Sequence, residues 1–400
     1  MLEYEFCVQE QFDLSQHRGK LGPLWAIVLF AAGALYSVID ARAQAPEPMA
    51  RCWSYSEPVL QAGGLAADET SVYFVDSGNT VIALDRRDGT TVWSAELGGT
   101  VNSSLIATKS SILVVTRTIS DGVKPNASYI RAVSKATGIT RWLGPLPNAE
   151  RYSIRDGGNG IVILENGSEI FAVETDKGQI RWRRSGLLIG DGGQEPASAS
   201  IATRSESGRI EVVSLVNGQT VDRFEWSATP VAFTSRTDQY FFGDTRGTIE
   251  SRHAGGGRVW NYKTGGAITQ LIVAGDNILA ASADNYIYSI SIRSGGITWK
   301  RKMPGRISSV DLLGSGKAGI TVFGEKTAYV VDVGDGRFVE QLDLDGEDEF
   351  IGHPLRGDHT FLTAITTRGL TAFSAYCSNE KAAVRSAAAS KNLFVGSQQN

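Results

Sequence analysis

The stretch Thr80-Val-Ile-Ala-Leu-Asp-Arg-Arg-Asp-Gly-Thr-Thr-Val-Trp93 has the pattern of two β-strands joined by a tight turn. Its first half is rich in β-branched and apolar residues, which favours a strand. Asp88-Gly89 then predicts the turn, because glycine adopts positive φ without steric cost. The second strand leads to Trp93. Six further copies of this pattern follow, so the chain is organised as repeats of one hairpin.

Each copy of the hairpin is marked by a turn glycine. Successive turn glycines are 49, 40, 40, 38, 39 and 41 residues apart, and they are Gly89, Gly138, Gly178, Gly218, Gly256, Gly295 and Gly336. A tryptophan follows four residues later in five copies, at Trp93, Trp142, Trp182, Trp260 and Trp299. Asp222 and Glu340 take its place in the other two. A period near 40 with several short strands per period indicates a β-propeller.

The two ends of the repetitive region each hold half a repeat. Trp53 matches the repeat tryptophan but has no first strand before it, whereas Gly369–Cys377 resembles a first strand with no second strand after it. We therefore expect the N-terminal strand to complete the blade that the C-terminal strands begin. Such closure leaves no unpaired edges between blades. The predicted fold is all-β, an eight-bladed β-propeller of four-stranded antiparallel blades.

Cys52 and Cys377 fall on the two strands of the hairpin in this composite blade. The closure hypothesis places them near one another, and an exported chain favours a disulfide between them. The bond would latch the ring and restrict the unfolded chain, a contribution on the order of 4–5 kcal/mol in the loop-entropy model. The alternative is a pair of buried, unpaired thiols.

We interpret the repeat tryptophans, Trp53 included, as structural anchors. A tryptophan at one place in each blade would pack against the neighbouring sheet and bury a large apolar area. The turn glycines are interpreted as structural in the same way. No catalytic, cofactor-binding or metal-binding residues are predicted. His353 and His359 lie near an acidic run, but their spacing matches no common metal-binding motif, and we interpret the segment as a solvated loop.

An uncharged, mostly apolar stretch occupies residues 21–39, with Arg18 and Lys20 before it and Ala43-Gln-Ala45 after it. This order predicts a signal peptide over residues 1–45. The stretch is also long enough to span a bilayer, so an uncleaved signal anchor is the alternative. Residues 46–377 would form the propeller, and residues 378–400 a disordered or weakly helical tail. The expected location is periplasmic or secreted, or membrane-anchored if the signal remains.

The charge of the predicted mature chain is nearly balanced. Without residues 1–45 it has 36 basic and 38 acidic residues, a net charge of about −2. This balance does not suggest a nucleic-acid partner or an anionic membrane surface. Membrane contact is expected only through the N-terminal segment, if it is not cleaved.

The pattern Ala-Leu-Asp-x-x-x-Gly-x-x-x-Trp, complete at Ala83–Trp93 and partial at 132–142 and 172–182, resembles the pyrroloquinoline quinone (PQQ)-like propeller repeat. The likeness covers about residues 51–377. Quinoprotein alcohol dehydrogenases share this repeat, but they are longer and carry adjacent cysteines and a calcium site of Glu, Asn and Asp. No adjacent cysteines occur here and no calcium ligands can be mapped, so we expect no PQQ cofactor and no catalysis.

The second family with this repeat is the propeller lipoprotein of the outer-membrane β-barrel assembly machinery (BamB). The sequence is similar to it in size, blade number and export signal, but it lacks a cysteine at lipobox spacing. The resemblance implies a non-catalytic exported scaffold that binds protein partners in the cell envelope. The alternatives are a quinoprotein-like, PQQ-binding oxidoreductase and a propeller that binds carbohydrate or cell wall.

Overall fold

The computed structural model describes residues 48–60, 64–118, 126–190, 200–205, 208–226, 228–236, 238–351 and 355–377. Strands and turns make up these residues. They contain no helix, and hence no helix that could cross a membrane. The predicted signal peptide and the predicted tail lie outside the described residues.

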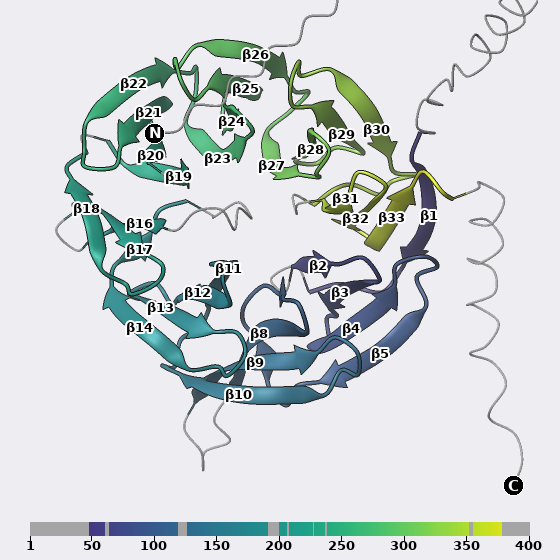
Figure 1. The fold of residues 1–400 in the computed structure, drawn as a ribbon. Coiled ribbons are helices and arrows are strands. Elements are labelled where there is room, and N and C mark those ends of the chain that lie inside the picture. Colours follow the sequence, from purple (N-terminus) through teal and green to yellow (C-terminus); the bar gives the residue numbers. More distant parts are fainter. Residues whose placement is uncertain are drawn as a thin grey trace, which may run out of the picture. The chain divides into compact units, whose positions relative to one another are not determined.

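The strands form eight antiparallel sheets, the blades of a propeller (Figure 1). The strands of each blade are given from the innermost to the outermost. Blade 1 consists of β2 (Leu65–Ala67), β3 (Ser71–Val75), β4 (Thr80–Asp85) and β5 (Thr91–Glu96), and blade 2 of β6 (Thr100–Val101) with β7 (Ile106–Ala107), β8 (Ser111–Thr118), β9 (Ala127–Ser134) and β10 (Thr140–Leu146). Blade 3 consists of β11 (Ser153–Asp156), β12 (Ile161–Glu165), β13 (Glu169–Glu174) and β14 (Ile180–Ser185), and blade 4 of β15 (Leu187–Leu188), β16 (Ser200–Arg204), β17 (Ile210–Ser214) and β18 (Thr220–Phe224).

Blades 5 to 8 follow in the same order. Blade 5 consists of β19 (Pro230–Arg236), β20 (Gln239–Asp244), β21 (Thr248–His253) and β22 (Arg258–Lys263), and blade 6 of β23 (Ile268–Ala274), β24 (Asn277–Ser282), β25 (Tyr286–Ser291) and β26 (Ile297–Lys302). Blade 7 consists of β27 (Ile307–Leu312), β28 (Lys317–Val322), β29 (Thr327–Asp332) and β30 (Phe338–Asp343), and blade 8 of β31 (Arg356–Asp358), β32 (Phe361–Thr366), β33 (Gly369–Ser374) and β1 (Ala50–Tyr55).

Strand β1 closes the ring. It pairs antiparallel with β33, with Ala50 opposite Ser374 and Tyr55 opposite Leu370. In Figure 1 the purple N-terminal strand lies beside the yellow C-terminal strands. The eight-bladed propeller and its composite last blade, both predicted from the half repeats, are thereby confirmed.

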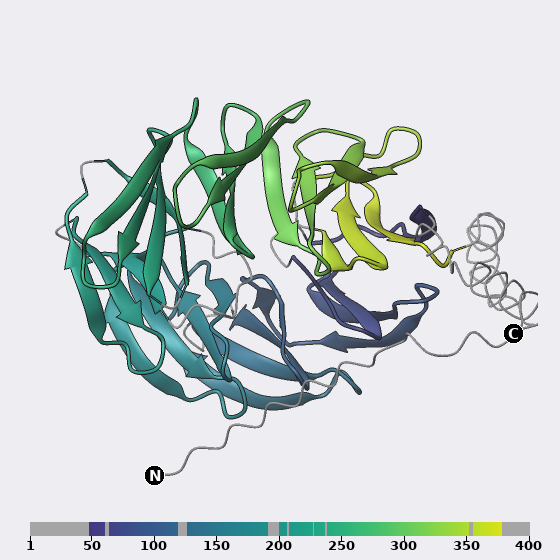
Figure 2. The same ribbon diagram turned by 45° about the horizontal axis from the view of Figure 1, so that its top comes forward.

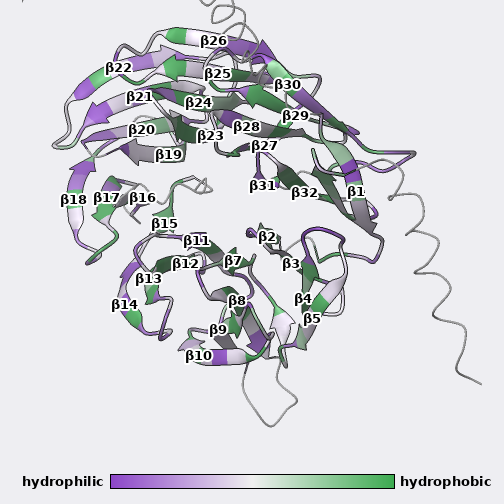
Figure 3. Ribbon diagram, turned by 45° about the vertical axis from the view of Figure 1, so that its right-hand side comes forward, coloured by the Kyte–Doolittle hydropathy of each residue, from purple (hydrophilic) through white to green (hydrophobic). Residues whose placement is uncertain are grey.

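The hydrophobic core lies between the blades. In blade 1 the two middle strands are buried along most of their length, whereas the outermost strand alternates between partly buried and exposed residues. The apolar clusters therefore combine two neighbouring sheets, as in the cluster that joins Leu279 of β24 to Ile320 of β28. The blades surround a common axis (Figure 2), and the first strand of each lies nearest to it in Figure 1. Hydrophobic colouring accordingly concentrates on the middle strands (Figure 3).

Every blade carries the same irregularity in its outer hairpin. The pairing register between the third and the outermost strand shifts by one residue just before the tryptophan position. In blade 1, Thr91 pairs with Leu84 and Trp93 with Ala83, which leaves Val92 as the bulged residue. In the composite blade the bulged residue is Cys52. A β-bulge re-aims the side chains next to it, so it helps turn each tryptophan toward the neighbouring blade.

Candidate functional site at the closure of the ring

The six repeat tryptophans each lie against the turn glycine of the next blade. The pairs are Trp53 with Gly89, Trp93 with Gly138, Trp142 with Gly178, Trp182 with Gly218, Trp260 with Gly295 and Trp299 with Gly336. In five pairs the indole N–H also donates to the carbonyl oxygen three residues before the glycine, at 2.7–3.0 Å. One side chain thus joins two blades by an apolar contact and a hydrogen bond.

The interface between blades 4 and 5 has Asp222 in place of the tryptophan. Its carboxylate accepts a 2.9 Å hydrogen bond from the N–H of Gly255, next to the predicted turn residue Gly256. The apolar contact comes instead from Trp226, whose ring lies 5.3 Å from that of Phe242 in blade 5. A polar and an apolar residue therefore divide the role that one tryptophan has elsewhere.

The interface between blades 7 and 8 has Glu340 at the tryptophan position. Its carboxylate accepts a 3.2 Å hydrogen bond from the N–H of Met49. No turn glycine exists at this place, because the outer hairpin of blade 8 is formed by the two ends of the propeller. Arg51 adds an ion pair with Asp345, across the same interface.

A disulfide joins Cys52 to Cys377, with 5.2 Å between their Cα atoms and 325 residues between them in sequence. By register with blade 1, Cys377 falls within the turn that connects the third and outermost strands, and Cys52 is the bulged residue that follows it. The disulfide therefore takes the place of the covalent turn that the other seven blades possess.

Two ion pairs connect neighbouring blades on the rim where this closure occurs. Arg86 of blade 1 donates to Asp358 of blade 8 at 2.6 Å, and its guanidinium lies 4.4 Å from the ring centre of Phe361. Lys135 of blade 2 pairs in the same way with Asp68 of blade 1. Asp68 follows the innermost strand of blade 1, and Asp358 is the last residue of the innermost strand of blade 8.

Asp358 and Asp68 are kept ionised by similar surroundings. Burial on its own would raise the pKa of Asp358, but hydrogen bonds from Thr360 and Arg86 outweigh it and lower the pKa to about 2. Asp68 has the same balance: burial raises its pKa, and the hydrogen bonds from Lys135 and from backbone N–H groups lower it to about 2. The rim turns are therefore fixed by charged contacts at neutral pH.

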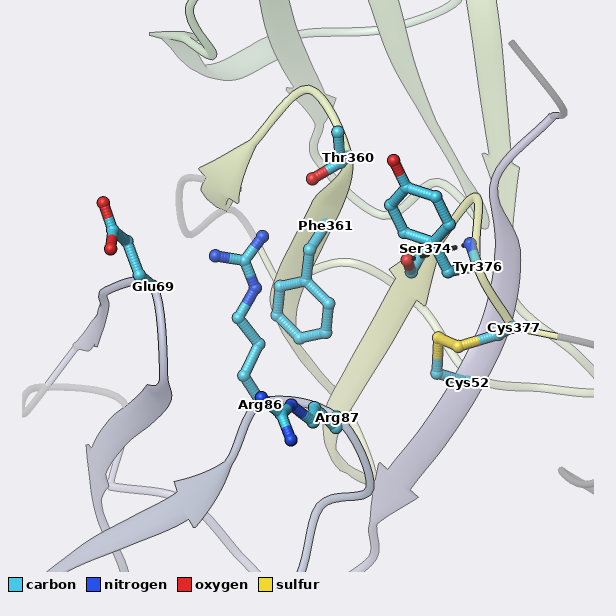
Figure 4. A pocket seen from close by; sticks show the side chains of 9 residues that line it. All are labelled: Cys52, Glu69, Arg86, Arg87, Thr360, Phe361, Ser374, Tyr376 and Cys377. Carbon is cyan, nitrogen blue, oxygen red and sulfur yellow. Dashed lines mark hydrogen bonds between the residues drawn. A yellow bond between two sulfur atoms is a disulfide. The ribbon is translucent and has the colours of Figure 1, made fainter.

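A pocket of about 300 Å³ opens at this seam between blades 8 and 1 (Figure 4). Its lining residues are Cys52, Glu69, Arg86, Arg87, Thr360, Phe361, Ser374, Tyr376 and Cys377. Tyr376 has 83% of its surface accessible, and its backbone N–H donates to Ser374 Oγ at 3.1 Å. An exposed tyrosine above an arginine–phenylalanine stack suits the recognition of a protein side chain, since Tyr and Arg are enriched at binding hot spots.

The seam does not suit a quinone held in the manner of the quinoproteins. Cys52 of the outermost strand is bonded to Cys377, which follows β33, and the two are not neighbours in sequence. In the described part of the chain, no group of three or more His, Cys, Asp or Glu side chains is arranged to hold a metal ion.

The structure thus gathers Cys52, Cys377 and Trp53 at one blade junction and places the other five tryptophans at five further interfaces, one at each. Sequence reasoning missed Arg86, Asp358 and Tyr376. The sequence contained part of the signal for these residues. When the last repeat is aligned with the first, Cys377 matches Asp88, and this alignment would have placed the end of the propeller beside the turn that contains Arg86. The histidine segment 353–359 supplies Asp358 to the ion pair, whereas His353 lies outside the described residues.

A family model described as outer membrane protein assembly factor BamB matches residues 40–196 and 206–391. The matched stretches cover most of the chain and, apart from β16's Ser200–Arg204, include every strand of the propeller. No curated protein matches the sequence.

Solved structures share the fold at low sequence identity. BamB from Moraxella catarrhalis has a TM-score of 0.56 at 14% identity, over 81% of this chain and 97% of that one. The computationally designed Ika8 protein has a TM-score of 0.63 at 13% identity, covering 82% and 99%. The C-terminal WD40 domain of Sif2 has a TM-score of 0.61 at 9% identity, covering 82% and 97%. A designed protein and a WD40 domain among these matches show that the architecture alone does not define an activity.

Proposed function

The chain belongs to the family of the outer membrane protein assembly factor BamB, and on this basis we propose that it is an exported, non-catalytic scaffold that binds a protein partner in the cell envelope. The observation that supports the proposal is the family match, which extends over both halves of the ring. Propellers present loops at two rims and so suit the binding of protein partners. The export signal predicted over residues 1–45 would deliver the chain to the periplasm.

The seam pocket is the contact we assign to this partner. Tyr376 offers a large amphipathic surface, and it is held close to the disulfide, so little conformational freedom is lost when it is covered. Arg87 and Glu69 at the pocket wall add charges of both signs. The partner would therefore present an apolar side chain flanked by polar groups.

Site-specific photocrosslinking in cells tests the proposal. A photoreactive phenylalanine analogue replaces Tyr376 in the full-length chain, and a matched variant carries it at Thr140, an exposed position on β10. We expect an outer-membrane assembly component to be crosslinked from position 376 but not from position 140, and Tyr376→Ala to lower its co-purification. Equal yields from both positions, or none from 376, would refute the seam as the partner site.

The same preparation separates the scaffold from its alternatives. We expect no change in the absorbance of PQQ upon titration with the protein and Ca²⁺, and no binding on an array of cell-wall sugars. A saturable spectral change would replace the scaffold proposal with the quinoprotein one. Saturable binding to a sugar would replace it with the carbohydrate-binding one.

A further inference from the structure

Basic side chains collect on the outermost strands of four consecutive blades. Strands β14, β18, β22 and β26 together carry nine basic residues and one acidic residue, Asp222. The basic residues are Arg181, Arg183, Arg184, Arg223, Arg258, Lys263, Lys300, Arg301 and Lys302. The other four outermost strands, β30, β1, β5 and β10, carry two basic and three acidic residues. We call the outer face of blades 3 to 6 the basic arc.

Some of the nine charges have structural roles. Arg184 and Arg223 both pair with Glu211, and Arg301 donates to the carbonyl of Gly336 at 2.6 Å. The side chains of Arg181, Arg183, Arg258 and Lys302 are different: they are exposed and form no hydrogen bond or ion pair within the described residues. These four cations are available to a ligand.

Lysine and arginine on an outer strand also protect its open edge against pairing with other chains. That role needs no particular sign of charge and applies to all eight outermost strands alike. Here nine of the ten charged residues on four neighbouring outermost strands are basic, whereas the other four strands carry two basic and three acidic residues, although the chain as a whole is slightly acidic. Segregation of this kind in a nearly neutral protein is typical of a surface that attracts an oppositely charged partner.

Each basic strand also exposes an aliphatic side chain. Ile180 on β14, Val221 on β18, Val259 on β22 and Ile297 on β26 are 41%, 54%, 37% and 39% exposed. Basic and aliphatic groups thus alternate around the outside of the ring, on strands that follow its circumference in Figure 1. A flat membrane or a straight nucleic-acid duplex would touch such a convex surface at one or two blades. An extended polypeptide can follow it.

We infer that the basic arc binds an extended, acidic polypeptide segment of a partner protein, with aspartate and glutamate interspersed among apolar residues. This inference rests on the proposed scaffold function and specifies the chemistry of the partner. It concerns a surface separate from the seam pocket of blades 8 and 1, so either site can fail its test without the other.

The probe is a fluorescein-labelled peptide of five Asp-Thr-Glu-Val repeats, titrated with the mature protein at low salt. The arc variant is Arg183→Glu/Arg258→Glu/Lys302→Glu, with one change on each of three strands. The control variant, Lys109→Glu/Arg151→Glu/Arg368→Glu, reverses three exposed charges outside the arc and has the same net charge. We expect the arc variant to lose at least tenfold in affinity and the control to stay within about twofold of the parent chain.

Equal losses in both variants would overturn the inference, because binding would then follow net charge alone. It would also be overturned if the parent chain failed to bind the peptide. Tighter binding to vesicles of 70% phosphatidylcholine and 30% phosphatidylglycerol, or to a 20-nucleotide single strand of DNA, would have the same consequence. The glutamine variant Arg183→Gln/Arg258→Gln/Lys302→Gln, which adds no negative charge, is expected to lose affinity too. It keeps the test valid if charge reversal impairs folding.

Discussion

The indole of Trp53 lies against Gly89, so that a Cβ atom added at position 89 would come within 2.6 Å of the ring. Gly89 has a φ of +72°, which a residue with a Cβ adopts only with strain. Two independent requirements, backbone conformation and close approach, therefore select glycine here. Because Trp53 belongs to the strand that closes the ring, this contact is also one of the links between the last blade and the first.

The two requirements can be separated by comparing Gly89→Ala with Gly98→Ala. Gly98 has a similar φ of +66° and no atom within 4 Å of an added Cβ. Gly98→Ala should cost about 1–2 kcal/mol for the left-handed backbone alone. Gly89→Ala should lower the midpoint of thermal unfolding clearly further, because Trp53 must move as well. Equal midpoints in calorimetry would show that the indole contact contributes nothing.

Loss of the disulfide should destabilise the ring without changing its fold. For a loop of 325 residues the entropy model gives a stabilisation on the order of 5 kcal/mol. We expect Cys52→Ala to unfold at lower denaturant concentration than the parent chain, and reduction of the parent to have the same effect. Cys52→Ala itself should not respond to the reductant. Mass spectrometry under non-reducing conditions should find a disulfide-linked peptide that contains residues 52 and 377. Two free thiols at these positions would contradict the disulfide.

Arg356 connects three blades near the axis. It donates to Asp311 of blade 7 at 2.8 Å and to the carbonyl of Leu65 in blade 1 at 3.3 Å, while it belongs to blade 8 itself. Burial raises the pKa of Asp311, and Arg356 opposes that effect. Arg356→Met leaves a buried carboxyl without its cation, which typically costs about 3–5 kcal/mol.

Removing both partners should be far less harmful than removing one. We expect the double variant Arg356→Met/Asp311→Leu to recover most of the stability lost in Arg356→Met, as measured by guanidinium unfolding. A double variant as unstable as the single one would show that Arg356 acts mainly through the Leu65 carbonyl, which connects blades 8 and 1.

Acid should weaken the ion pair between Asp358 and Arg86 at the rim. The pKa of Asp358 is about 2 in the folded protein, compared with 3.8 for a free side chain. The unfolded chain then binds protons more readily than the folded one, so the stabilisation is complete above pH 4 and is lost as the pH falls toward 2. Asp358→Asn should flatten this part of the stability profile. Asp276→Asn, at a position 97% exposed, is the matched control and should leave the profile unchanged. Parallel profiles for all three proteins would mean that the pair with Arg86 is not formed.

The ring, its blade number and its closure could be predicted because the repeat has its own local signals. Gly89 and Trp93 recur at a constant offset, and the half repeats at Trp53 and Gly369 can only be reconciled by joining the two chain ends. The disulfide followed from that closure. The roles of Asp222 and Glu340 could not be foreseen. Each role depends on the group that faces the side chain across an interface, the N–H of Gly255 for Asp222 and that of Met49 for Glu340. The residues next to Asp222 and Glu340 in the sequence do not specify these partners.

The candidate site was hidden for the same reason. Arg86 and Asp358 lie 272 residues apart in sequence and meet only when the first blade contacts the last. Arg356 and Asp311 belong to innermost strands, which carry no repeated motif. The basic arc was also obscured, because its residues are spread over about 120 positions of a chain with balanced charge. Only the stacking of blades brings them to one side.

The closure also determines how the molecule would respond to a pulling force. Residues 48 and 377 leave the propeller at the same end of the β1–β33 pair, where Ala50 faces Ser374. Tension between the two chain ends would unzip that strand pair, breaking its hydrogen bonds one after another. A sheet resists force least in this geometry. With Cys52 bonded to Cys377, the tension passes from one end to the other through the two sulfur atoms. If the N-terminal segment were fixed and the tail were pulled, the force would therefore pass through the disulfide. The eight blades would not bear it.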